Sequence, residues 1–184
     1  DDRFAILSIR PFDSRTYGND MTAAAIALLA DRVGFERLSF TIIGDGPLFD
    51  EALEPIRKIP NVVLQRRFLT QQEIAQEHRR HGIFLVPTRL DTHGVSRDEA
   101  MASGLVPVTN AVSAVPEFVD EHCAALAPPD DVPGLADGLW RMVEDPGRFL
   151  RRSAAAARRV RARTGHEIVI PQELALLAQA ARRG

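Results

Sequence analysis

The sequence contains almost no cysteine or lysine. Cys123 is the single cysteine among 184 residues, so no internal disulfide can form, and no cluster of cysteine and histidine has zinc spacing. Lys58 is the single lysine, which excludes a Walker-type phosphate loop and leaves a poor candidate for a pyridoxal phosphate lysine. No apolar run approaches the roughly 20 residues of a membrane-spanning helix.

Length and charge indicate an ordinary globular protein. A chain of 184 residues, 45% of them hydrophobic, can bury a core, and we expect one domain over residues 1–184. The formal net charge of −2 gives no electrostatic case for a nucleic-acid partner. The single cysteine is compatible with a reducing cytoplasm. Because the sequence opens directly into a predicted strand, without a leader, we expect it to be part of a longer protein.

Short apolar segments alternate with helical patterns along the chain. The patterns predict strands at residues 4–9, 38–43, 62–64, 83–86, 106–109 and 124–127. They predict helices at residues 21–33, 49–59, 70–80, 132–144, 146–163 and 168–181, and one more directly after Gly94. This alternation predicts an α/β fold, a Rossmann-like, doubly wound parallel sheet of about six strands flanked by helices. Ligands of such sheets lie beyond the carboxyl ends of the strands.

The most informative stretch is PTRLDTHGVSRDEAMASG, residues 87–104. It follows a predicted strand and leads into a helix. Ser96 followed by Glu99 predicts a capping box, which would place the amides of Gly94 and Val95 at the positive end of that helix. Such an end binds anions, and a phosphate is the expected guest.

Two carboxylates flank this predicted anion site. Asp91 stands eight residues before Glu99, so the two acids meet only if the loop folds back. Carboxylates beside a phosphate site accept hydrogen bonds from hydroxyls, as an acidic residue does with ribose in dinucleotide-binding folds. The alternative is that Glu99 only caps its helix and Asp91 only shapes a turn.

The stretch resembles the acidic motif of the retaining GT-B glycosyltransferases of family four. In that motif two glutamates separated by seven residues flank a Gly-Phe-Gly turn, followed by Glu-Ala-Met-Ala-x-Gly and Pro-Val. The residues that match in register are Glu99, Ala100, Met101, Ala102, Gly104, Pro107, Val108, Pro116 and Glu117. The resemblance implies the C-terminal, donor-binding domain of a sugar transferase that retains anomeric configuration and lacks its N-terminal acceptor domain here. It implies a nucleotide diphosphate sugar as substrate, with no metal and no other cofactor.

The resemblance also assigns roles to residues. It implies that Glu99 binds the ribose hydroxyls and Asp91 a hydroxyl of the donor sugar, and these two carboxylates mark the catalytic centre. Arg10 and the amides from Gly94 to Ser96 would hold the diphosphate, whose growing charge the site must stabilise. The other residues expected to bind the donor are Arg15, Gly18, Gly44, Gly46, Phe68, Leu69, Thr92, His93 and Val95.

Two positions depart from the family pattern. Tyr17 stands before Gly18 where the family usually has lysine, so a neutral phenol replaces an ammonium. We therefore hypothesise that Arg15 joins Arg10 at the diphosphate; the alternative is a solvated loop arginine. Asp91 replaces the usual glutamate and shortens its reach by one methylene, which leaves the donor sugar undetermined.

The remaining loop residues each admit two interpretations. Gly44 and Gly46 match a turn of the family, but the third glycine of a dinucleotide fingerprint is missing, which disfavours an NAD site. Phe68 and Leu69 align with the loop that contacts the base, whose identity the sequence does not give, and a core role for Phe68 is the alternative. His93 could donate to a sugar hydroxyl or a phosphate, or be an exposed loop histidine.

Several features elsewhere are interpreted as structural. Thr70 with Glu73 predicts a capping box, and His78 with His81 predicts a solvated helix face rather than a metal site. On the helix at 146–163, a predicted arginine side, at positions 148, 151, 152, 158, 159 and 163, opposes an apolar side of Phe149, Leu150, Ala157 and Val160. We favour an amphipathic surface helix; contact with anionic lipid at the inner membrane face, or with a partner, is the alternative.

Two other functions are compatible with the same residues. A noncatalytic nucleotide or nucleotide-sugar binding module would keep the anion site without transfer. A purely structural interaction domain would bind no nucleotide. If the resemblance holds, the isolated chain should bind nucleotide and transfer nothing, because the acceptor domain is missing.

Overall fold

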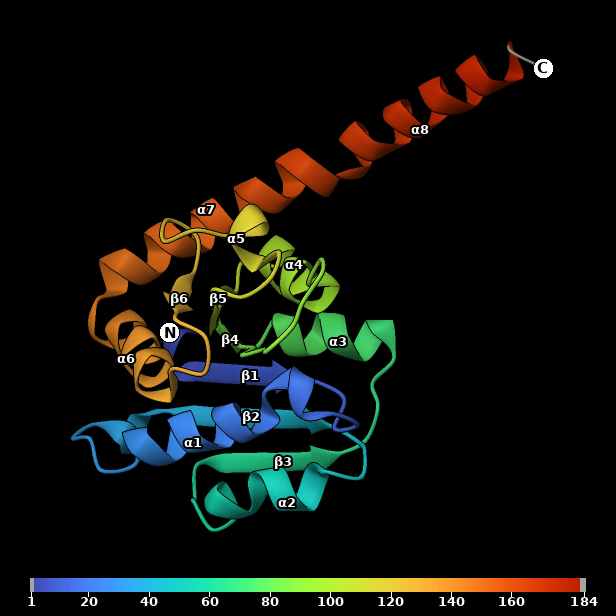
Figure 1. The fold of residues 1–184 in the computed structure, drawn as a ribbon. Coiled ribbons are helices and arrows are strands. Elements are labelled where there is room, and N and C mark those ends of the chain that lie inside the picture. The colour runs from blue at the N-terminus through green and yellow to red at the C-terminus, as the bar shows by residue number, and fades with distance from the viewer. Residues whose placement is uncertain (1, 183–184) are drawn as a thin grey trace.

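The computed structural model describes residues 2–182, which form a six-stranded sheet covered by helices (Figure 1). Every strand pairing is parallel, and the strand order is β3-β2-β1-β4-β5-β6. The strands are β1 (Ala5–Ile9), β2 (Ser39–Gly44), β3 (Val62–Arg66), β4 (Ile83–Leu85), β5 (Val106–Asn110) and β6 (Ala125–Ala127). The predicted doubly wound parallel sheet is confirmed.

The helices follow the strands in the predicted alternation. They are α1 (Asn19–Leu29), α2 (Phe49–Leu53), α3 (Gln71–His78), α4 (Val95–Ala102), α5 (Val115–Phe118), α6 (Val132–Glu144), α7 (Pro146–Thr164) and α8 (His166–Ala181). The helix predicted at 49–59 ends at Leu53 and continues as a 3-10 turn, Glu54–Ile56, because Pro55 interrupts the helical hydrogen bonds. The four-residue α5 was not predicted, since it is too short to show a helical period.

Core residues lie on both faces of the sheet. Ile6 of β1 is buried with Ile26 of α1 and Leu139 of α6. Its neighbour Leu7 is buried in a separate cluster with Ala100 of α4. Successive side chains of a strand point to opposite faces, so a strand covered on both sides reads as a continuous apolar run. This double burial is why the strands could be located from sequence.

Two histidines, one at the end of α3 and one three residues beyond it, are turned inward. His78 and His81 are both buried, and the Nε2 atom of His81 lies 3.1 Å from the hydroxyl of Thr41 on β2. Burial is the largest cause that lowers the pKa of His78, followed by the charge of His81. The prediction of a solvated face is therefore wrong; this side of α3 covers the sheet.

Several arginines of α7 bond to neighbouring elements, although four of the seven are exposed. Arg159 forms an ion pair with Asp120, and Arg163 donates to the carbonyl oxygen of Glu117 at 2.6 Å. Leu150, placed on the predicted apolar side, is 64% exposed. The amphipathic prediction thus holds only in part, because tertiary contacts along α7 use both sides of the helix.

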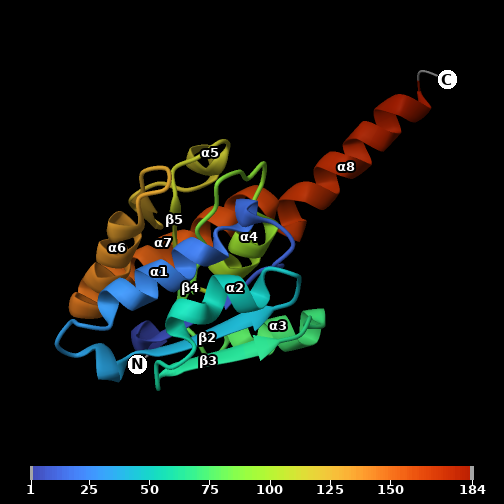
Figure 2. The same cartoon turned by 60° about the horizontal axis from the view of Figure 1, so that its bottom comes forward.

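α8 extends away from the rest of the protein in both views (Figures 1 and 2). None of its residues is buried. Within residues 2–182, no helix is both long enough and apolar enough to span a bilayer.

Candidate functional site

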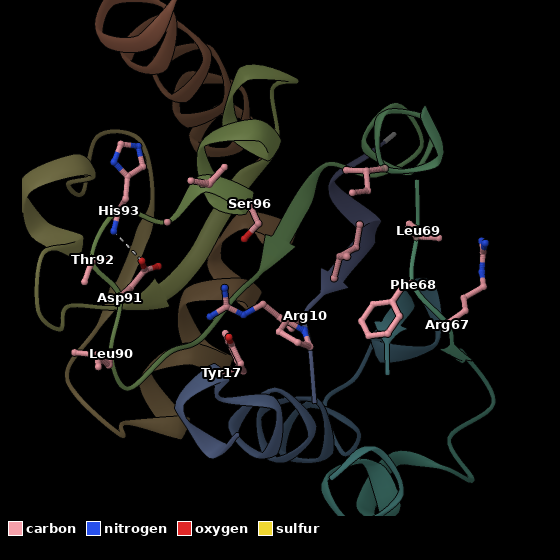
Figure 3. A pocket seen from close by; sticks show the side chains of 16 residues that line it. Arg10, Tyr17, Arg67, Phe68, Leu69, Leu90, Asp91, Thr92, His93 and Ser96 are labelled. Atoms are coloured by element: carbon pink, nitrogen blue, oxygen red, sulfur yellow. Dashed lines mark hydrogen bonds between the residues drawn. The ribbon is translucent and has the colours of Figure 1, made fainter. Parts of the chain in front are cut away.

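A cavity of about 550 Å³ opens where the strand order reverses, beyond the carboxyl ends of β1 and β4 (Figure 3). The switch in strand order separates the loops after these two strands, and ligands of doubly wound sheets bind in the resulting crevice. The cavity is lined by Ile9, Arg10, Pro11, Tyr17, Gly44, Arg67, Phe68, Leu69, Ile74, Leu90, Asp91, Thr92, His93, Gly94, Val95 and Ser96.

Most of the predicted donor-binding residues line this cavity, but four do not. Arg15, Gly18, Gly46 and Glu99 lie outside it. Arg15 lines a different cavity, where its guanidinium is 2.7 Å from the carboxylate of Glu51 on α2. The structure therefore does not bring Arg15 and Arg10 together, and the hypothesis of a joint diphosphate grip is not supported.

Arg10 is the central cation of the cavity. It directly follows β1, and its backbone N–H donates to the carbonyl oxygen of Ile43, 3.1 Å away. Its side chain is 9% exposed, and its buried Nε has no hydrogen-bond partner among residues 2–182. The guanidinium carbon lies 5.2 Å from the centre of the Tyr17 ring. Burial lowers the pKa of Arg10, while the nearby Asp91 carboxylate raises it.

Gly44 allows the ends of β1 and β2 to approach. A Cβ atom at Gly44 would collide with the carbonyl oxygen of Arg10 and come 2.8 Å from the ring of Phe12. A larger residue would therefore displace Arg10 itself. This close approach is a structural reason for glycine at that position.

Arg89 joins the two loops that carry the polar residues of the cavity. Its guanidinium makes a bidentate ion pair with Asp20, at 2.8 and 2.9 Å, and a second ion pair with Asp130 at 2.8 Å. It also donates to the carbonyl oxygen of Arg15 at 2.7 Å. The hydrogen bond from Arg89 is the largest cause that lowers the pKa of Asp20. The loop after β4 is thereby held against the loop before α1.

Asp91 shapes the turn that precedes α4. One carboxylate oxygen accepts a hydrogen bond from the backbone N–H of His93, 3.1 Å away, as Figure 3 shows. The His93 ring packs 4.7 Å from the ring centre of Phe118, and its Nε2 lies 3.5 Å from the Asp98 carboxylate. Asp91 thus serves as a turn former and also presents its carboxylate to the cavity.

The start of α4 differs from the predicted capping box. The helix begins at Val95, its N-cap is Gly94 with φ 78°, and no side chain caps it. Ser96 therefore lies inside the first turn and lines the cavity, while Glu99 does not bond back to it. The capping-box prediction is wrong here, because a left-handed glycine, Gly94, already caps the helix two residues before Ser96.

A buried arginine lies beneath this turn. Arg97 is 2% exposed, donates to the carbonyl oxygen of His93 and pairs with Asp98 at 3.1 Å. Its guanidinium carbon lies 5.3 Å from the centre of the Phe118 ring. The burial of Arg97 was not predicted, since a single arginine in a predicted helix gives no sign of it.

Glu99 faces a second cavity of about 370 Å³, between α4 and the junction of α7 and α8. His93 and Val95 line both cavities, whereas Asp91 lines only the first of the two and Glu99 only the second. The structure therefore does not place the two carboxylates around one space. The ribose role implied for Glu99 stays a prediction.

Apolar and aromatic side chains form the other end of the cavity. Phe68 lies at the rim of the cavity and is 69% exposed, so the alternative of a core role is wrong. Arg67 lines the same end and is held by Glu73 at 2.7 Å. Arg67 and Ile74 were missed, because their position depends on how the loop after β3 turns into α3. The capping box of Thr70 and Glu73, which fixes that turn, is confirmed.

Residues 2–182 contain no group of three or more histidine, cysteine or acidic side chains arranged to hold a metal ion. The buried guanidinium and the helix N-terminus can bind an anion, and the adjacent carboxylate can accept hydrogen bonds from hydroxyl groups. The polar groups of the cavity therefore suit an anion that also carries hydroxyl groups.

Comparisons with known proteins agree with this geometry. A family profile described as glycosyl transferases group 1 matches residues 3–145. No curated protein matches the sequence. Among solved structures, sucrose-phosphate synthase from Thermosynechococcus elongatus superimposes with a TM-score of 0.83 at 20% identity, over 98% of this chain and 46% of that one.

Two further solved structures are similar. An Anabaena protein in complex with UDP and glucose has a TM-score of 0.79 at 17% identity, covering 97% of this chain and 49% of its own. The C-terminal domain of a glycosyl transferase group 1 family protein from Francisella tularensis has a TM-score of 0.75 at 20% identity, covering 86% and 85%. This chain spans less than half the length of the first two. The shared fold is that of the GT-B glycosyltransferases.

Proposed function

This chain belongs to the glycosyl transferases group 1 family, and from that premise we propose that its cavity binds the nucleotide diphosphate part of a sugar donor. The observation that carries the proposal is the buried and only partly hydrogen-bonded guanidinium of Arg10. Its guanidinium is nearly buried, its Nε has no hydrogen-bond partner among residues 2–182, and it lines the cavity opposite Ser96 at the start of α4. A buried charge without a full set of partners is costly, and a diphosphate would supply the missing acceptors.

Different regions of the cavity suit the three parts of such a ligand. The diphosphate would lie between Arg10 and the N-terminal turn of α4, where backbone amides favour negative charge. The base would lie toward Phe68 and the sugar toward Asp91, whose carboxylate can accept hydrogen bonds from hydroxyls.

We further propose that the full protein transfers the sugar with retention of configuration. The bond between the anomeric carbon and the phosphate oxygen breaks, a bond to an acceptor hydroxyl oxygen forms, and the proton of that hydroxyl passes to the departing diphosphate. Charge accumulates on the departing diphosphate, where Arg10 and the helix amides stabilise it, so the proposal requires no metal. A further domain would bind the acceptor, and residues 1–184 alone would bind nucleotide without transfer.

Calorimetric titration of UDP, GDP and ADP into the 184-residue chain tests the binding proposal. One of these nucleotides should bind, and Arg10→Ala should weaken that binding at least about tenfold, the loss expected for a charge-assisted hydrogen-bonding pair. Arg15→Ala is the matched control, since Arg15 pairs with Glu51 outside the cavity and should leave affinity unchanged. If none of the nucleotides binds, the proposal fails.

A noncatalytic nucleotide-binding module is the second candidate. It is favoured by Tyr17, a neutral group beside Arg10, and by the engagement of Asp91 with the His93 amide. A sugar-transfer assay on the full-length protein separates the two candidates. Nucleotide binding without any transfer or donor hydrolysis would support the module.

A further inference from the structure

A separate cavity of about 230 Å³ lies at the outer edge of β6, between α6 and α7. The three elements lie side by side in Figure 1, and β6 is the last strand of the sheet. This edge cavity shares no lining residue with the cavity at Arg10. It is therefore independent of the proposed donor site.

Three arginines converge on the edge cavity from two helices. Arg141 comes from the last turn of α6, while Arg148 and Arg152 are four residues apart on α7 and so share one helix face. Gly138 lets α6 approach the strand, since a Cβ atom there would come 3.1 Å from the Cβ of Ala125. The close packing directs the arginines to the rim of β6.

Only one of the three arginines has a carboxylate partner. Arg148 is 3.6 Å from the Asp145 carboxylate, but the partner of half-buried Arg152 is a thioether, the Met142 sulfur 3.6 Å away. The guanidinium of Arg141 makes no hydrogen bond or ion pair with any residue between 2 and 182, whereas its backbone carbonyl oxygen accepts a hydrogen bond from the N–H of Asp145. A guanidinium offers five N–H donors, so most donors of this group are free for a ligand. Burial, then the charges of Arg148 and Arg141, lower the pKa of Arg152.

Two acids also line the edge cavity, but neither neutralises it. Asp137 is engaged by Arg32, outside the cluster. Glu121 is exposed, and its charge raises the pKa of Arg152 and so opposes the effect of the arginines. Within residues 2–182 it forms no ion pair with the three arginines. Glu121 is therefore the natural competitor of an incoming anion.

We propose that this edge cavity binds a phosphate monoester group through Arg141 and Arg152. The planar fork of arginine matches phosphate oxygens in pairs, and a dianion would balance the two unpaired cations. The volume is below the roughly 300–1,000 Å³ of sites that enclose a whole ligand. The cavity thus admits the phosphoryl group and leaves the rest of the molecule outside.

Inorganic phosphate is the probe, titrated into the Arg10→Ala protein so that the cavity at Arg10 does not contribute. The double variant Arg141→Gln/Arg152→Gln, made in that protein, should bind phosphate at least about tenfold more weakly, because glutamine keeps polarity but removes charge. Circular dichroism and thermal melting verify that it is folded. Unchanged phosphate affinity in the folded variant would overturn the proposal.

A variant in the opposite direction guards against loss of folding. Glu121→Gln removes the competing carboxylate and should tighten phosphate binding, so weaker or unchanged binding would count against the site. In protein with Arg10 intact, the double variant should keep its nucleotide affinity. That result separates failure of the edge cavity from failure of the proposed donor site.

Two ligands distinguish a soluble phosphate monoester from a lipid headgroup as the source of the phosphate group. Glycerol 3-phosphate represents a soluble monoester, and phosphatidylcholine vesicles with phosphatidic acid represent a lipid headgroup. Binding of either one that depends on Arg141 and Arg152 supports the proposal and identifies the source. Binding of neither would overturn it.

Discussion

Arg97 occupies the space that a side chain on Gly94 would need. A Cβ atom at Gly94 would come 2.5 Å from the guanidinium carbon of Arg97, and the glycine has φ 78°. The turn before α4 and the buried cation beneath it therefore require each other. The amides proposed to face the diphosphate are set by this pair.

Gly94→Ala should destabilise the protein and weaken nucleotide binding. The left-handed backbone alone costs an alanine about 1 kcal/mol, and displacement of Arg97 should add about 2 kcal/mol, typical of overpacking. Gly104→Ala is the matched control, since Gly104 has φ 93° but its added Cβ would meet only the Ser153 hydroxyl, at 3.4 Å. Urea unfolding measures both variants. Equal losses of unfolding free energy in the two variants would contradict a collision between the new side chain at position 94 and Arg97.

Arg97→Met should cost about 3–5 kcal/mol of unfolding free energy, because it leaves the Asp98 carboxylate and the His93 carbonyl without their buried partner. Adding Asp98→Asn should recover part of that loss. Arg158→Met, at an exposed position of α7, should change stability by no more than about 0.5 kcal/mol. A small effect of Arg97→Met would mean that the pair contributes little to the turn.

Glu73 should titrate far below an ordinary glutamate. The backbone N–H of Thr70, then Arg67, lowers its pKa from 4.5 to about 2. Since the folded pKa is depressed, the stabilisation is present above about pH 4.5 and is lost as the pH falls toward 2. NMR titration of the side-chain carboxyl measures this pKa. Arg67→Gln should raise the pKa of Glu73 but keep it below 4.5, because the hydrogen bond from the Thr70 backbone persists. A return to 4.5 would contradict the larger effect assigned to the Thr70 hydrogen bond.

Arg89→Gln should loosen the two loops at the cavity. Because the Arg89 hydrogen bond is the largest cause that lowers the pKa of Asp20, this variant should raise that pKa toward its ordinary value. Nucleotide affinity should fall while the fold is retained, since the Arg89 side chain bonds to loop residues and to the first turn of α1 but not to the strands of the sheet. Arg66→Gln, which removes ion pairs to Asp45 and Asp50 elsewhere, serves as the control. An unchanged Asp20 pKa would show that Arg89 does not hold the loops in solution.

Local patterns were sufficient where neighbours in sequence are also neighbours in space. The bounds of α6, residues 132–144, were predicted without error, because a complete amphipathic period marks the helix. The Thr70–Glu73 capping box was equally visible, since both partners lie within one turn. The ligand role predicted for the loop after β4 stays a prediction; the structure shows only that this loop lines the cavity at Arg10.

Local patterns failed where a residue's environment comes from distant parts of the chain. Arg15 is five residues from Arg10, yet the 3-10 turn Arg15–Tyr17 directs it to Glu51. His78 was expected to be solvated, but α3 turns it against Phe84 of β4. No spacing rule within one helix or loop could have predicted these orientations.

The sequence by itself determined the alternation of strands and helices, the parallel sheet and the loops at which a ligand should bind, because hydrophobic period and turn residues act over a few positions. Tertiary structure alone decided that Arg10 is buried and only partly satisfied, that Asp91 and Glu99 line different cavities, and that Arg97 supports the turn at Gly94. Burial and charge pairing depend on segments tens of residues apart, and only packing brings those segments together.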